Sequence, residues 1–165
     1  MAAIDVLGTV CDRLVEGMMF HSDRADLCRY MGFERLTKLH EDGFHDDSAS
    51  FRKVRRMCVE RLDAIPPQGR QERGRSLDVW RGKVRRSVTT EERRKCLMEV
   101  MSDWVDWEDG TADTFRTAAH RLWDMGETAL SERVNKLADS TESELARASA
   151  LHNRLVATDW DATIA

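Results

Sequence analysis

Five ionisable side chains lie on or beside apolar helical stripes of the sequence, where they could do chemistry. They are His21, His40, Asp47, Glu108 and Glu144. Imidazole and carboxylate groups together bind zinc, iron or manganese. Because buried polar groups need partners, the same residues could instead form a hydrogen-bonded network that fixes how the helices pair. From the sequence we favour the network, and therefore no cofactor, with a mixed His/carboxylate metal site as the alternative.

No other motif indicates a reaction. The sequence contains no Gly-x-Ser-x-Gly, no Gly-x-x-x-x-Gly-Lys-Ser/Thr and no Cys-x-x-Cys, so it argues against hydrolases, nucleoside triphosphatases and zinc-ribbon or thiol redox sites. The four cysteines fall mostly on apolar helix faces, which is typical of buried free thiols. These absences favour a protein that is not an enzyme and leave the question of catalysis open.

The elements that must position these residues are helices. The chain has 165 residues, 34% of them charged, with only 9 Gly and 2 Pro, a composition that favours long solvated helices over a turn-rich β fold. Apolar residues recur at steps of three and four over four long stretches. The spacing predicts an all-α protein with helices over about 3–31, 33–65, 90–125 and 127–157.

The ends of these helices have local signals. Gly32 and Gly126 can adopt the left-handed conformation that ends a helix, and the pair Pro66 and Pro67 ends the second helix. Thr89 and Glu92 form a capping box that starts the third helix, which we expect to continue through Gly110. Residues 66–88 then form a long crossover containing a short helix near 76–85.

Two antiparallel hairpins joined by this crossover predict a single four-helix-bundle domain over residues 1–165. Folding the first hairpin at Gly32 sets residue 21 opposite residue 43, which brings His21 within about one turn of His40, with Asp47 one turn further on. Folding the second at Gly126 sets Glu108 level with Glu144. Each hairpin therefore carries a polar level, and the sequence leaves open whether the two levels coincide.

This pattern resembles the ferritin-like superfamily, whose four-helix bundles have a long crossover and inward-facing carboxylates and histidines. The runs FHSDRADL at 20–27, YMGF at 30–33 and WVDWE at 104–108 are similar to small uncharacterised ferritin-like proteins of bacteria and their prophages. The resemblance implies this fold over about residues 3–157. It implies no particular activity.

The superfamily's metal signature, Glu-x-x-His, is absent from the sequence, and Asp42-x-x-His45 is the nearest approach. Carried over by position, Glu108 matches the carboxylate of the third helix, and Glu41 or His40 stands for the first ligand of the second helix. His21 replaces a carboxylate of the first helix, and Glu144 lacks its histidine. The resemblance therefore implies at most a divergent metal site.

The charge is divided unevenly along the chain. The formal net charge is −4, yet residues 52–95 carry 15 basic and 6 acidic side chains between two acidic ends. We interpret this segment as a solvated surface whose charge balances that of the two acidic ends. The net charge excludes a basic field over the whole domain, and a local contact of this segment with phosphate or nucleic acid is the alternative. Nucleic acid is therefore a disfavoured partner.

The first ten residues lack the pattern of a secretory signal, and no apolar run approaches the ~20 residues needed to cross a bilayer. We expect a cytoplasmic, non-enzymatic interaction or structural protein, with a homo-oligomer or another protein as its partner and no membrane. A ferritin-like metal-binding protein is the alternative.

Overall fold

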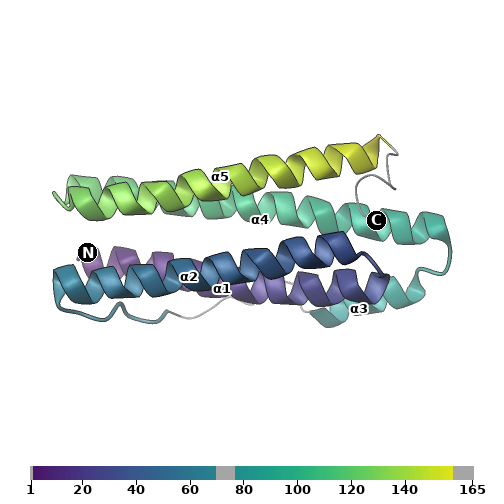
Figure 1. Cartoon of the computed structure of the whole chain (residues 1–165), viewed down its shortest axis with the longest axis horizontal. Helices are drawn as coiled ribbons and strands as arrows, with labels where there is room; N and C mark the ends of the chain where they lie inside the picture. Colours follow the sequence, from purple (N-terminus) through teal and green to yellow (C-terminus); the bar gives the residue numbers. More distant parts are fainter. Residues whose placement is uncertain (1, 70–76, 158–165) are drawn as a thin grey trace.

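The computed structural model describes residues 2–69 and 77–157, and this part of the chain is all-helical. Within it no strand occurs, which confirms the all-α prediction. The helices are α1 (Ala3–Met31), α2 (Glu34–Leu62), α3 (Leu77–Arg86), α4 (Thr90–Asp124) and α5 (Thr128–Val156). The four long helices run along the length of the molecule, and α3 lies against one side (Figure 1).

Two glycines make the tight turns that were predicted. Gly32 follows α1 with φ 84°, and its N–H donates to the carbonyl of Arg29; Gly126 follows α4 with φ 81°. A Cβ is disfavoured at such angles, so glycine is the residue that ends a helix there. The turns fold α1 against α2 and α4 against α5.

Helix α4 begins at the predicted capping box. The Thr89 hydroxyl accepts the Glu92 N–H at 3.2 Å, and the Glu92 carboxylate accepts the Thr89 N–H at 2.9 Å. The helix then continues without interruption through Gly110. Both features agree with the sequence prediction.

The predicted end of the second helix was wrong by three residues. Helix α2 ends at Leu62 rather than at Ile65, and Asp63 adopts a left-handed conformation with φ 46°. The ring of Pro66 disfavours helical angles at the residue before it, so the chain leaves the helix before the prolines are reached. Part of the predicted crossover, residues 70–76, lies outside the described residues.

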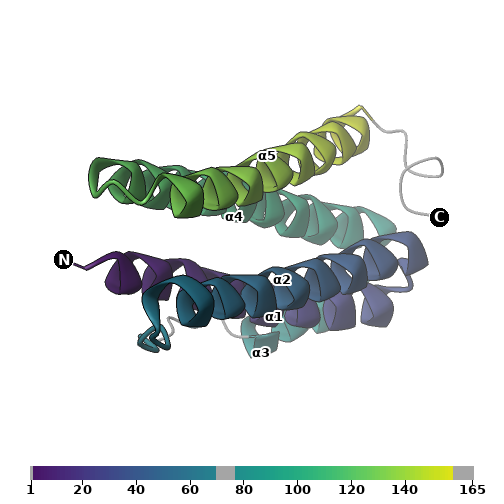
Figure 2. The same cartoon turned by 60° about the vertical axis from the view of Figure 1, so that its left-hand side comes forward.

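Side chains from all four long helices meet in two apolar clusters. One surrounds Leu14 and Phe115 near the N-terminal end of α1, and the other surrounds Cys28 and Trp104 near the turn at Gly32. Helix α1 also packs on α4, and Trp80 of α3 is buried against α1 and α4 in a third cluster. Figure 2 shows the two helix pairs from a second side.

None of the described helices combines the length and the apolarity that a membrane-spanning segment needs. All four cysteines are buried free thiols, as was predicted from the three that lie on apolar stripes; Cys96, which lies on none of the predicted stripes, is buried as well.

Candidate metal site

A polar layer separates the two large apolar clusters. His21 and His40 are 2% and 0% exposed and Glu108 is 3% exposed, while Asp47 and Glu144 are partly buried. They come from α1, α2, α4 and α5. Because ligand atoms of His21 from the first hairpin and of Glu108 and Glu144 from the second lie within 4.8 Å of one another, the polar levels of the two hairpins coincide. The structure therefore settles the point that the sequence left open.

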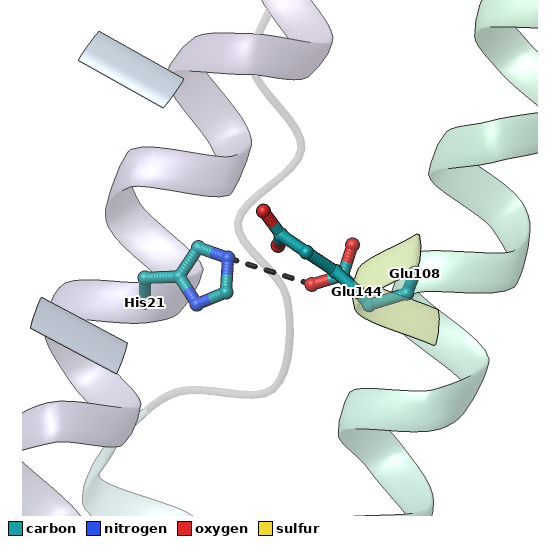
Figure 3. Close-up of side chains that lie close together, drawn as sticks. All are labelled: His21, Glu108 and Glu144. Carbon is teal, nitrogen blue, oxygen red and sulfur yellow. Dashed lines mark ion pairs between the residues drawn. The ribbon is translucent and has the colours of Figure 1, made fainter. Parts of the chain in front are cut away.

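Three of these residues form a compact group. Atoms Nε2 of His21 and Oε1 of Glu108 are 3.5 Å apart. One nitrogen of His21 and one oxygen each of Glu108 and Glu144 all lie within 4.8 Å of one another. Figure 3 shows His21 reaching across from α1 towards the two glutamates. Such a spacing lets one ion contact all three groups.

Asp47 lies at the edge of this group. Its Oδ2 is 3.9 Å from Nε2 of His21. A cavity of about 30 Å³ is lined by Asp47, Glu108 and Glu144, together with Asp46 and Thr141. That volume holds one or two waters or an ion. Asp47 is thus within reach of anything bound by the other three residues.

His40 does not join the group around the cavity. Its Nδ1 lies 3.1 Å from Nδ1 of His21, on the side of that ring opposite Nε2. Its own Nε2 is buried without a hydrogen-bond partner, and its ring packs on Trp104 with centroids 4.5 Å apart. His40 therefore contacts the Nδ1 atom of His21 and does not face the carboxylates.

The other candidates on α2 lie on the surface. Glu41 forms an ion pair with Arg29 at 2.5 Å, and Asp42 forms one with Lys38 at 3.3 Å. His45 is exposed. The nearest approach to Glu-x-x-His thus contributes nothing to the polar layer.

Trp104 is a site residue that the sequence analysis missed. Its position on the stripe indicated packing alone, and it is indeed buried. Its Nε1–H also donates to Oε1 of Glu108 at 2.9 Å. This bond holds the Glu108 carboxylate from one turn earlier on the same helix. The spacing of four residues was the signal that could have identified it.

Burial sets the ionisation of the polar layer. It raises the pKa of Asp47 and of Glu108 to about 8, with the nearby negative charges adding to the effect, and it also raises the pKa of Glu144. Burial lowers the pKa of His21 to about 4 and that of His40 well below its usual value, with the positive charge of Arg24 contributing. The layer thus holds neutral imidazoles beside carboxyls that ionise only at a cost.

Two glycines in helix interiors make room for the polar layer. The His21 ring of α1 packs on the backbone of Gly43 in α2, and Asp47 of α2 packs on Gly17 in α1. The turn at Gly32 sets residue 21 opposite residue 43 and residue 17 opposite residue 47, which are the two pairs in contact here. The polar side chains fit between α1 and α2 because glycine has no Cβ there.

We expect Gly43→Ala to destabilise the protein by about 1–3 kcal/mol, since the new Cβ would lie 2.8 Å from the His21 ring and overpack the interface. Alanine ordinarily stabilises a helix relative to glycine by up to ~1 kcal/mol. Gly82→Ala in α3, where the nearest atom is the end of Arg86 at 3.6 Å, should show that ordinary gain. Urea unfolding measures both, and a gain of stability in Gly43→Ala would contradict the packing described.

No protein-family model matches the chain, and no curated protein matches it either.

Proposed function

We propose that the chain is a divergent ferritin-like four-helix bundle that binds one divalent transition-metal ion through His21, Glu108 and Glu144, with Asp47 as a fourth ligand. The observation that carries the proposal is the spacing of the first three residues, whose ligand atoms all lie within 4.8 Å of one another. Three helices contribute them, so the site depends on the packing of the two hairpins.

The packing supports the bundle. Both large apolar clusters take side chains from α1, α2, α4 and α5, as the core of a four-helix bundle does. Ligands that project inward from several helices at one level are the usual way in which such bundles build metal sites.

The hydrogen bonding of the layer is the reason for preferring the metal site to the network that the sequence favoured. A buried network stabilises a fold only when its members find partners. Glu108 accepts one hydrogen bond, from Trp104. Within the described part of the chain, Asp47 and Glu144 accept none, although His21 approaches Asp47. A cation would satisfy these carboxylates together.

The donor set fits the ion. One neutral imidazole and two or three carboxylates are ligands that zinc, iron(II) and manganese(II) accept. The cation would also stabilise the ionised carboxylates that repel each other without it. Such an ion would supply Lewis-acid chemistry, and iron or manganese would add redox chemistry. His40 would hold the His21 ring in place through the Nδ1 contact.

Titration of chelator-treated protein with Co²⁺ tests the proposal. We expect one equivalent to bind with a visible absorption spectrum, and Zn²⁺ to displace it. Glu144→Gln should weaken binding about 100-fold, because it removes a charged ligand. Glu142→Gln, which lies on the exposed face of the same helix, is the matched control and should bind like wild type.

The proposal would be wrong if wild-type protein took up no metal, or if Glu144→Gln bound Co²⁺ as tightly as the Glu142→Gln control. The expectation of an interaction or structural protein stays a prediction. The expectation of a homo-oligomer also stays a prediction, and measuring the molecular size of the same samples tests it.

A further inference from the structure

A groove of about 620 Å³ runs between α2 and α5 and has no role in the metal site. Both helices lie along the same side of the molecule in Figures 1 and 2. Its floor is apolar and includes Val54 and Met57 from α2 and Val134 and Leu137 from α5. A groove of this volume lies in the size range of sites that bind small organic ligands.

Basic side chains surround the groove. Lys53 and Arg61 line it from α2, and Arg133 and Lys136 line it from α5, against a single carboxylate, that of Glu132. All four cations are exposed, and none forms an ion pair with any described residue. Elsewhere cations such as Arg116 pair with nearby carboxylates. An excess of unpaired positive charge on a protein of net charge −4 favours an anionic ligand.

The groove leads to the polar layer. Ser50, Leu137 and Ser140 line both the groove and the 30 Å³ cavity beside Asp47 and Glu144. Along α2, the residues pass from Asp47 at the cavity through Ser50 to the basic rim. Along α5, the lining residues pass from Glu144 at the cavity through Ser140 to Lys136 and Arg133 at the basic rim. A ligand in the groove would therefore have one end at the basic rim and the other near the two serines.

We propose that this groove binds an organic anion with an apolar chain, such as a medium-chain carboxylate. Its charged group lies among Lys53, Arg61, Arg133 and Lys136, and its chain covers the apolar floor. The chain points towards the serines because a carboxylate end there would face the carboxyl groups of Asp46, Asp47 and Glu144, which line the cavity and offer it no positive charge. Binding itself is independent of the metal; only the placement of the chain end beside an ion rests on the function proposed above.

Calorimetric titration of metal-free protein with decanoate tests this site without reference to the metal. We expect one decanoate to bind at least about tenfold more tightly than acetate, which lacks the chain, or decyltrimethylammonium, which has the opposite charge. In protein labelled with ¹³C at the methionine methyls, decanoate should shift the Met57 signal, because this side chain lies in the groove floor.

The double reversal Lys53→Glu with Arg133→Glu should weaken decanoate binding about tenfold or more. Arg56→Glu is the control for a charge reversal on α2, since Arg56 is exposed and does not line the groove, and it should bind like wild type. If the double variant does not fold, the Met57 shift in wild-type protein decides.

The proposal would be overturned if decanoate did not bind, if the cationic amphiphile bound equally well, or if Arg56→Glu weakened binding as much as the double reversal. Binding of inorganic pyrophosphate in place of decanoate would also overturn it, because it would make the groove a phosphate site. Since no metal is present in these titrations, failure here leaves the Co²⁺ result unaffected.

Discussion

Metal-free protein should lose about 2 kcal/mol of its free energy of unfolding as the pH rises from 6.5 to 8. The loss arises from Asp47 and Glu108, whose pKa values are raised to about 8 by burial and by neighbouring negative charges. A carboxyl that keeps its proton over this interval contributes about 2 kcal/mol at most. Because the Asp47 side chain is 24% exposed, we expect Asp47 and Glu108 together to contribute about 2 kcal/mol, rather than that amount each.

The direction follows from proton binding in the two states. In the unfolded chain these carboxyls ionise near pH 4, so at pH 6.5 the native state holds protons that the unfolded state has released, and its stability falls as the pH rises. His21 and His40 act in the opposite direction, because their lowered pKa values leave the native imidazoles neutral, while those of the unfolded chain are still half protonated near pH 6.5 and lose their protons as the pH rises further. This gain is smaller than the loss from the carboxyls, and the buried thiols, whose pKa values are raised, add a small loss near pH 8.

Urea unfolding at pH 6.5 and pH 8 measures this loss. Glu108→Gln should remove half of the loss or more, since the amide does not ionise, and Glu142→Gln should retain the loss. Saturating Co²⁺ should abolish it, because a bound cation stabilises the ionised carboxylates and stabilises the folded protein by mass action. A stability that stays constant or rises between these two pH values would contradict the account of the polar layer.

The contacts within each hairpin could be predicted from the sequence because they depend on local geometry. A turn at Gly32 and the helical repeat set His21 opposite Gly43, and the structure places the imidazole ring on that glycine. The turn at Gly126 likewise brings Glu108 and Glu144 to one level. Each prediction required only the position of the turn and the period of 3.6 residues.

The relation between the two hairpins could not be predicted in this way. Whether the polar levels meet depends on how α1 packs on α4, which is determined by side chains far apart in the sequence. The same limit applies to the histidines. Both His21 and His40 interrupt apolar stripes, but only His21 faces the carboxylates, and His40 packs behind it.

The sequence analysis overlooked residues whose role depends on a neighbouring helix. Gly17 and Gly43 lie inside apolar stripes where glycine costs helix stability, and each lies opposite a polar residue across the turn at Gly32. That coincidence was the available signal. The groove between α2 and α5 had none, because its lining comes from two helices that are not neighbours in sequence.

Asp103→Asn should lower the free energy of unfolding by about 3 kcal/mol, which would make it one of the most destabilising substitutions of a charged residue in this protein. Arg24 is 3% exposed, forms an ion pair with Asp103 and lies over the rings of Phe20 and Trp80. Removing the carboxylate leaves a buried cation without its counter-ion, which is far more costly than losing a surface pair.

Arg24→Met should cost only about 1 kcal/mol, because methionine keeps the contact with the two rings and Asp103, whose side chain is 34% exposed, can turn towards water. In the Arg24→Met background, Asp103→Asn should then have almost no further effect, since no buried cation remains to be neutralised. A double-mutant cycle by urea unfolding would show this as a coupling of about 2 kcal/mol or more. Equal costs for the two single variants would instead mean that the contact of Arg24 with the rings of Phe20 and Trp80 stabilises this part of the core as much as the ion pair with Asp103 does.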